Sequence, residues 1–275
     1  MNGDSQQGAQ GSGPEPGPGP VPSVPAHSKL DVRGVLRSVL LGLVIGSAAL
    51  ALLLPSIRAL QAPRAAAVAP PAPALQRQLD LGTQAVSADA RLLAEAVVKR
   101  GDNGRLPFVL IDKREAQLLV FEASGRLLGA TPILLGYAAG DDSVAGIGQR
   151  PIAEVKPSER TTPAGRFVAE PGRNTLGEDV IWVDYETAVS MHRVRLNDPK
   201  ERRLERLASP HAADRRISYG CINLPVAFFD SMLWPTLRGK GGVVYVLPEF
   251  KRMADAFPTL LPAAAERQAR LQHMV

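Results

Sequence analysis

The chain has 275 residues, of which 45% are hydrophobic and 21% are charged, and its formal net charge is +5. The positive charge is spread along the sequence and has no interleaved aromatic residues, which argues against nucleic-acid binding. One cysteine and four histidines are too few to form the spacings of a metal site.

The first part of the chain is expected to lie outside any globular domain. Residues 1–32 are rich in Gly, Pro, Ser and Gln and predict a disordered tail, because they offer little apolar area to offset the entropy of ordering. Residues 33–57 include the uncharged stretch Ser38 to Leu54, which is near the minimum length for a bilayer-spanning helix. We therefore predict a single transmembrane anchor. A cleaved signal peptide is the alternative, although no clear small-residue cleavage site follows.

The charges that flank this segment set the expected orientation. Basic residues before it (Lys29, Arg33 and Arg37) outnumber those after it (Arg58 and Arg64), which favours a cytoplasmic amino terminus. The rest of the chain would then lie outside the cytoplasm. A lone cysteine in such a compartment cannot form an internal disulfide, so a retained thiol there favours a chemical role.

A linker and a helix follow the anchor. Residues 58–75 are rich in Ala and Pro and predict an extended linker. Residues 76–104 predict a helical segment, because apolar residues recur at helical spacing from Leu79 to Val97. Ser87 either caps or interrupts this helix, and Gly101 ends it.

From Leu106 the apolar pattern changes to that of strands. Three apolar runs, at residues 108–111, 118–121 and 127–135, are separated by short polar breaks, and residues 123–125 have the composition of a hairpin turn. The pattern predicts a meander of antiparallel strands.

Further strands and an insertion come next. A Thr-Pro-Ala-Gly turn at residues 162–165 leads into a strand, and one or two more follow, the last ending at His192. Residues 194–217 form a polar, Arg-rich segment in which a helix begins at Asp198. We expect this segment to be an insertion that projects from the sheet.

The last part of the domain repeats the strand pattern. A short strand and then a helix from about Pro225 are predicted after Cys221, and residues 243–246 predict a closing core strand. Residues 105–250 would form one domain, followed by a tail at 251–275.

The single cysteine lies in the sequence ISYGCINLP, directly after Gly220. A thiol becomes a useful nucleophile when it is deprotonated, partly exposed and near a base. A tight Gly-Cys turn would expose the sulfur and direct backbone amides into the same space as an oxyanion hole. The alternative is that Cys221 is an inert, buried apolar residue.

The histidines supply the candidate bases. His27 and His273 lie in the two tails, and His211 lies in an irregular polar stretch. His192 ends a predicted strand, and such rigid placement favours it as the base. Spacing alone leaves His211 as the alternative.

Three motifs in this order, TPAGRF, MHRV and ISYGCINLP, resemble the L,D-transpeptidase catalytic domain, which has the YkuD-like fold. The family signature is an upstream histidine, here His192, and then Ser/Thr-His-Gly-Cys, an apolar residue, and Asn or Arg. Five residues match this signature in order: Ser218, Gly220, Cys221, Ile222 and Asn223. Tyr219 replaces the second histidine, and the spacer after His192 is longer than usual.

The resemblance implies a mainly β fold, a YkuD-like β-sandwich with a few helices, which would follow the transmembrane helix predicted above. It also implies acyl transfer on peptidoglycan tetrapeptide stems, with Cys221 as nucleophile and His192 as base and with no metal or organic cofactor. The implied oxyanion and substrate-binding residues are Gly220, Tyr219, Ser218, Asn223 and Arg193. The protein would then be a single-pass protein of a bacterial inner membrane, with its domain in the periplasm or cell-wall space.

Three points stay open at this level. The same fold could serve as a catalytically inactive peptidoglycan-binding scaffold in which Tyr219 has removed turnover. The Cys/His pair could also belong to a thiol hydrolase of unrelated specificity. Part of the Arg-rich insertion, whose basic residues include Arg195, Arg203, Arg215 and Arg216, is expected to face the carboxylates of stem peptides. The alternative is a solvated helix face with internal ion pairs.

Overall fold

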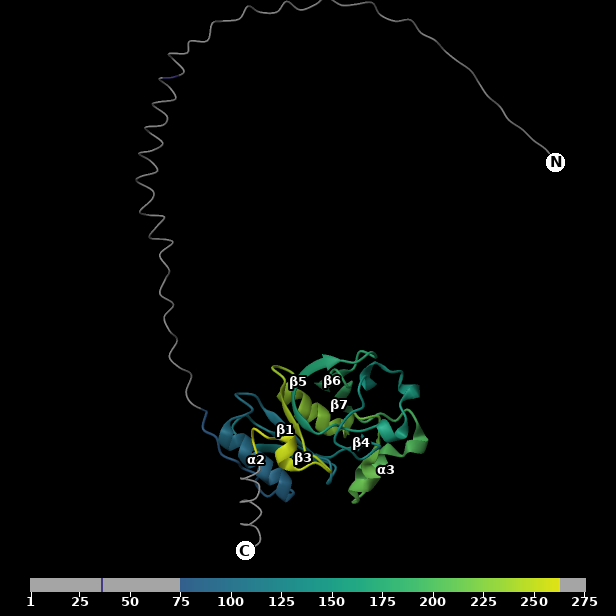
Figure 1. Ribbon diagram of the computed structural model, residues 1–275, viewed down its shortest axis with the longest axis horizontal. Coiled ribbons are helices and arrows are strands. Elements are labelled where there is room, and N and C mark those ends of the chain that lie inside the picture. The colour runs from purple at the N-terminus through teal and green to yellow at the C-terminus, as the bar shows by residue number, and fades with distance from the viewer. Residues whose placement is uncertain (1–35, 37–74, 263–275) are drawn as a thin grey trace, which may run out of the picture. The chain divides into compact units, whose positions relative to one another are not determined.

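The computed structural model of the protein describes residue 36 and residues 75–262 (Figure 1). Apart from Leu36, these residues belong to a compact unit that begins at Ala72. The predicted tail, anchor and linker lie outside the described residues, except for Leu36 and Leu75, as do residues 263–275. Within the described ranges, no helix is both long and apolar enough to cross a membrane.

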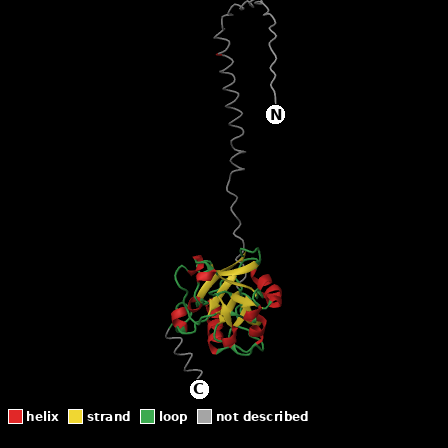
Figure 2. Cartoon of the chain, turned by 90° about the vertical axis from the view of Figure 1, so that its right-hand side faces the viewer, coloured by secondary structure: helices red, strands yellow, loops and turns green. Residues whose placement is uncertain are grey.

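Eight strands form one mixed sheet in the order β3-β2-β1-β10-β5-β6-β7-β9. A second, two-stranded sheet pairs β4 with β8. The strands are β1 Phe108–Asp112, β2 Gln117–Phe121, β3 Leu127–Pro132, β4 Leu135–Gly136, β5 Gly165–Arg173, β6 Asp179–Asp184, β7 Val189–Arg193, β8 Arg216–Ser218, β9 Ile222–Leu224 and β10 Gly242–Val246. The mainly β prediction is confirmed, and Figure 2 shows the strands at the centre with short helices around them.

The predicted meander corresponds to β1, β2 and β3, which pair in antiparallel register. Gly125 occupies the predicted hairpin turn with φ 105°, a conformation that favours glycine. The third apolar run is shorter than predicted as a strand, because the ladder with β2 ends at Pro132, which has no N–H to donate. Leu135 then begins β4.

The sheet folds around a shared core. The first half of β5 pairs with β10, and its second half pairs with β6, so β5 belongs to both halves of the sheet. The inner faces of the two halves meet in one buried cluster, which includes Val109 and Val120 from one half and Ile181, Met191 and Ile222 from the other. This arrangement gives the sandwich-like packing that places β7 and β9 at one edge of the sheet.

Helices cover the outer face of β1, β2 and β10. The helix α2 (Ala88–Arg100) begins after Ser87, whose side chain accepts from the Ala90 amide, and ends at Gly101 in the left-handed conformation. It is shorter than the predicted segment 76–104, because the cap at Ser87 fixes its start and the residues before it form only an isolated bridge at Asp80 and a turn. It packs on the sheet together with α6 (Met253–Ala256), so the core continues past residue 250.

The Arg-rich insertion contains η4 (Pro199–Glu201), α3 (Arg203–Ala208) and η5 (Ala212–Arg215). Asp198 caps the first of these turns, as predicted. The segment does not project freely, because Leu207 packs with Leu134 and Val194 at the edge of the sheet. The remaining elements are η1 Ile147–Gln149, η2 Ile152–Glu154, η3 Pro157–Glu159, α4 Val226–Phe228, the π-helical turn η6 Phe229–Leu233 and α5 Trp234–Leu237.

Candidate active site

The edge strand β9 and its neighbour β7 bring the predicted site residues together. They run parallel, and His192 lies directly opposite Asn223 in their register. Because side chains alternate along a strand, residue 190 faces the same side as His192, and Ser190 Oγ lies 3.7 Å from Cys221 Sγ. Four polar or reactive side chains are therefore grouped on one face of this strand pair.

A pocket of about 230 Å³ opens over this face. It is lined by Cys221, His192, Ser218, Tyr219 and Asn223, together with Ile152, Arg195, Asn197, Glu201 and Arg203. Five of the seven predicted site residues thus share one pocket, and Gly220 lies in the turn between two of them.

Two predicted candidates lie elsewhere. The Arg193 guanidinium pairs with Asp230, with Nε 2.7 Å from Oδ1, and lies over the Phe229 ring. It alternates away from His192, so it is not in the pocket lining. His211 is exposed at the start of η5 and also lies outside the pocket. Of the two histidines that the structure describes, His192 is the one that lines the pocket with Cys221.

The turn before Cys221 requires glycine. Gly220 has φ 127°, and a Cβ at this position would lie 2.9 Å from the Thr161 carbonyl oxygen. The Gly220 amide donates to Ser218 Oγ at 3.1 Å, and Ser218 Oγ donates to the Cys221 carbonyl at 2.6 Å. No hydrogen bond within residues 75–262 uses the Cys221 amide, so this amide is the better candidate for an oxyanion donor.

A threonine of the Thr-Pro-Ala-Gly turn holds the nucleophile turn in place. Thr162 is fully buried, and its Oγ1 donates to the Gly220 carbonyl at 2.8 Å. The same oxygen accepts from the Gly136 amide at 3.0 Å. The motif was recognised in the sequence, but nothing in the sequence indicated that its threonine contacts Gly220.

The thiol is half-buried and has two polar neighbours. Cys221 Sγ donates to the Ala188 carbonyl at 3.5 Å, and Ser190 Oγ is the second neighbour. In the described part of the chain, no hydrogen bond joins the sulfur to the His192 ring. The expected contact between nucleophile and base is therefore not formed in this structure, although both groups open into the same pocket.

Both nitrogens of the His192 ring have partners. Nδ1 lies 2.7 Å from the Arg193 carbonyl, which can only accept, so Nδ1 carries the hydrogen. Nε2 lies 3.2 Å from Asn223 Nδ2 and accepts from it. Burial, together with the positive charges of Arg195 and Arg203, lowers the pKa of His192 to about 4. The ring is therefore neutral at neutral pH.

Tyr219 stands where the family signature has its second histidine. It is 37% exposed, and the Arg160 guanidinium carbon lies 3.7 Å from the centre of its ring. This cation–π contact fixes the ring at the rim of the pocket.

Arg215 and Arg216 are not among the arginines of the insertion that line the pocket. Arg216 forms an ion pair with Glu249 and donates to the Lys113 carbonyl at 3.1 Å. Arg215 donates to the carbonyls of Ser209 and Glu115. Both guanidiniums are thus held by partners inside the fold, and the arginines that the insertion contributes to the pocket are Arg195 and Arg203.

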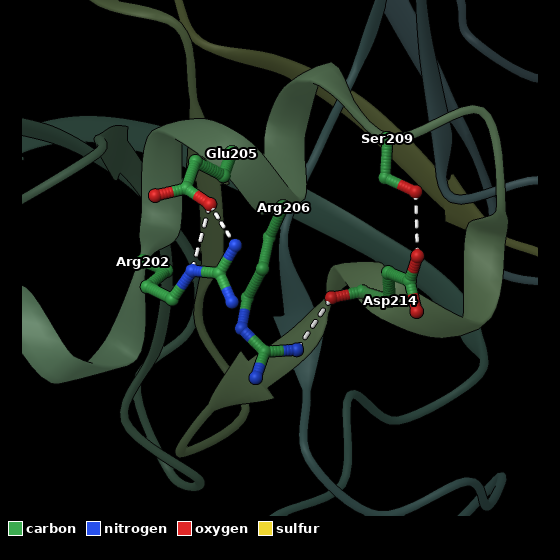
Figure 3. Close-up of a pocket in the computed structure, with 5 residues that line it drawn as sticks. All are labelled: Arg202, Glu205, Arg206, Ser209 and Asp214. Carbon is green, nitrogen blue, oxygen red and sulfur yellow. Dashed lines mark hydrogen bonds and ion pairs between the residues drawn. The ribbon is translucent and has the colours of Figure 1, made fainter.

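A neighbouring hollow on α3 and η5, of about 250 Å³, carries no candidate chemistry (Figure 3). Its polar groups satisfy one another: Arg202 pairs with Glu205, Arg206 donates to the Asp214 carbonyl, and Ser209 donates to the Asp214 carboxylate. None of these side chains faces Cys221 in the same cavity.

Comparison with family profiles finds no match for this chain, and comparison with curated proteins also finds none. Solved L,D-transpeptidase structures do match it. A crystal structure of the Enterococcus faecium L,D-transpeptidase is 18% identical, with 51% of this chain and 49% of that chain covered and a TM-score of 0.30. The L,D-transpeptidase from Xylanimonas cellulosilytica is 16% identical, with 56% and 68% covered and a TM-score of 0.31.

The helical cell-shape-determining protein Pgp2 from Campylobacter jejuni is also similar, at 18% identity, with 59% of this chain and 56% of that chain covered and a TM-score of 0.34. This chain spans about half the length of the E. faecium enzyme. The TM-scores are below 0.5, so these similarities assign no function to this protein.

Proposed function

We propose that this protein is an L,D-transpeptidase that acts on peptidoglycan stem peptides through an acyl-enzyme on Cys221. The observation that carries the proposal is the placement of Cys221 and His192 on one face of the parallel strands β7 and β9, opening into one pocket. The turn Ser-Tyr-Gly-Cys-Ile-Asn presents the thiol, and Thr162 and Ser218 hold that turn.

The first half of the proposed reaction forms a thioester. His192 Nε2 takes the thiol proton, and Cys221 Sγ attacks the carbonyl carbon of the bond between the diamino acid and the terminal D-Ala of a tetrapeptide stem. The Cys221 amide stabilises the oxyanion. When the carbon–nitrogen bond breaks, His192 returns the proton to the amine of D-Ala, which leaves.

The second half transfers the acyl group. An amine on a second stem, or a free D-amino acid, gives a proton to His192 and attacks the thioester carbon. The carbon–sulfur bond breaks and the Cys221 thiolate regains the proton. The product is a cross-link or an exchanged terminal residue, and attack by water gives hydrolysis instead.

The test uses the full-length protein and its Cys221→Ala variant, each incubated with tetrapeptide muropeptides and followed by mass spectrometry. We expect cross-linked or exchanged products, with loss of D-Ala, from the wild type only. A carbapenem should add covalently to the wild type and not to the variant. Identical product profiles from the two proteins would rule out catalysis by this thiol.

A membrane anchor at residues 33–57, with the domain in the periplasm or cell-wall space, is part of the same proposal. It predicts that the full chain sediments with membranes and is released by detergent but not by high salt. Protease added to spheroplasts should then degrade the domain. Recovery of the chain in the cytosolic fraction would contradict the anchor.

One observation favours a second candidate, a non-catalytic peptidoglycan-binding scaffold. The thiol and the imidazole are not hydrogen-bonded within the described residues, and Tyr219 replaces the signature histidine. A scaffold would sediment with purified peptidoglycan equally well as wild type and as Cys221→Ala, and neither protein would release D-Ala. Release of D-Ala by the wild type alone decides for the enzyme.

A further inference from the structure

Four side chains form a continuous line of hydrogen bonds along one wall of the pocket, which we call the Glu201–His192 chain. Glu201 Oε2 accepts from Arg203 Nε at 2.5 Å. Arg203 Nη1 donates to Asn223 Oδ1, and Asn223 Nδ2 lies 3.2 Å from His192 Nε2. The insertion supplies the first two members, and the strands β9 and β7 supply the other two.

The direction of every hydrogen bond in this chain is fixed by Arg203. A guanidinium can only donate, so the side-chain oxygen of Asn223 has to face it. The amide nitrogen of Asn223 therefore faces His192, and Nε2 can only be an acceptor. The Nδ1 hydrogen bond to the Arg193 carbonyl requires the same tautomer.

This arrangement opposes proton transfer from Cys221 to His192. A hydrogen on Nε2 would point at the Asn223 amide, which is itself a donor. Asn223 could resolve the conflict by turning its amide over, but its amide nitrogen would then face the Arg203 guanidinium. Asn223 is 1% exposed, so water cannot compensate for either mismatch.

We propose that Arg203 is a positioning residue that, through Asn223, keeps His192 Nε2 as an acceptor and holds the imidazole uncoupled from the Cys221 thiol in the unliganded protein. The inference rests on the roles proposed above for Cys221 and His192. It assigns a role to the Arg-rich insertion, which would restrain the base until Arg203 releases Asn223.

The test measures the rate at which iodoacetamide alkylates the protein from about pH 5 to pH 9, a range that brackets the usual thiol pKa. The chain has one cysteine, so the rate reports Cys221 alone. Arg203→Lys keeps the positive charge but loses the planar fork that contacts Glu201 and Asn223 together. Asn223→Ala removes the group that occupies Nε2.

Both variants should lower the midpoint of the alkylation profile, because the freed imidazole can accept the thiol proton. A fall of one pKa unit raises the thiolate fraction about tenfold and lowers its nucleophilicity about threefold, so the rate at pH 7 should rise about threefold. The double variant should react no faster than Asn223→Ala, since Arg203 acts through Asn223. Adding His192→Ala to Asn223→Ala should return the alkylation rate at pH 7 to the wild-type value.

Arg202→Lys is the matched control, because Arg202 directly precedes the helix α3, has a largely exposed side chain and pairs with Glu205. Its alkylation profile should equal that of the wild type. An unchanged profile for Asn223→Ala or for Arg203→Lys, or additive effects in the double variant, would overturn the proposal.

A second measurement needs no variant. Nitrogen-15 NMR of the histidine rings should show Nε2 of His192 unprotonated in the wild type at neutral pH, and a protonated Nε2 would also overturn the proposal. The alkylation assay contains no stem peptide, so it is independent of the proposed reaction. If the alkylation profiles change but no muropeptide products form, the proposed transpeptidase reaction is wrong and the role of Arg203 stands. If products form but the profiles do not change, the role of Arg203 is wrong and the reaction stands.

Discussion

Thr162 Oγ1 joins the nucleophile turn to the neighbouring strand β4, because it donates to the Gly220 carbonyl at 2.8 Å and accepts from the Gly136 amide at 3.0 Å. Thr162→Val keeps the shape but leaves two buried backbone groups unpaired. We expect a loss of at least about 1–3 kcal/mol in the free energy of unfolding, measured by urea titration. Thr162→Ser keeps the hydroxyl and should retain most of the stability. Equal stability of the two variants would contradict the role of this hydroxyl.

Gly220 is constrained by both its backbone angle and its neighbours. Gly220→Ala would place a side chain at φ 127° and bring its Cβ within 2.9 Å of the Thr161 carbonyl oxygen. We expect a destabilisation of at least about 1–3 kcal/mol in urea unfolding. The control is Gly146→Ala, at φ 71° with nothing within 4 Å of the added Cβ, which should cost only about 1 kcal/mol. A smaller cost at Gly220 than at Gly146 would show that the close approach to Thr161 is relieved.

Asp141 anchors a buried charge cluster that includes Lys113 and Glu249. Burial opposes its ionisation, but hydrogen bonds from the Glu249, Lys251 and Phe250 amides and from Lys113 outweigh burial and hold its pKa well below the usual range. A carboxyl with a lowered folded pKa stabilises the protein above its unfolded pKa, near 4, and this stabilisation is lost as the pH falls further.

Asp141→Asn should therefore remove part of the acid-induced loss of stability below about pH 4. It should also cost about 3–5 kcal/mol at neutral pH, because the buried Lys113 ammonium loses its nearer carboxylate partner, 2.9 Å away, and keeps Glu249 at 3.7 Å. Urea unfolding at several pH values measures both effects. The neighbouring Asp142 is exposed and pairs with Lys251 at the surface, so Asp142→Asn should change the stability by less than about 0.5 kcal/mol. Equal effects of the two variants would contradict the assignment of Asp141 to the core.

His192 should make the free energy of unfolding depend on pH at higher pH values than Asp141 does. Its folded pKa is about 4, lowered mainly by burial, whereas the unfolded side chain titrates near 6.5. Between these values the unfolded state binds the extra proton, so the stabilisation is complete above about pH 6.5 and is lost as the pH falls towards 4. The full loss is on the order of 3 kcal/mol.

The variant His192→Gln should flatten the dependence of the urea midpoint on pH between about 4 and 7. His211 is exposed, and His211→Gln should keep the wild-type slope. If His211→Gln removes the pH dependence of the urea midpoint and His192→Gln does not, the buried histidine with the lowered pKa is not His192.

Much of the local structure followed from the sequence. The strands β1 and β2, the turn at Gly125, the cap at Ser87 and the end of α2 at Gly101 all lie where local patterns predicted them. Apolar alternation and the conformational freedom of glycine act over a few residues, so these features can be predicted from the sequence alone. The same applies to the exposure of Cys221 on a turn that requires glycine.

The contacts of the candidate site were decided by the tertiary structure. The sequence placed His192 and Cys221 in one site, but the parallel register of β7 and β9 sets Asn223 beside the imidazole and Ser190 beside the sulfur. The insertion brings Arg203 to Asn223, while Arg216, which looked equally available, is held by Glu249. A buried polar group bonds to the partner that chain closure places within about 3 Å, and separation along the sequence does not encode that distance.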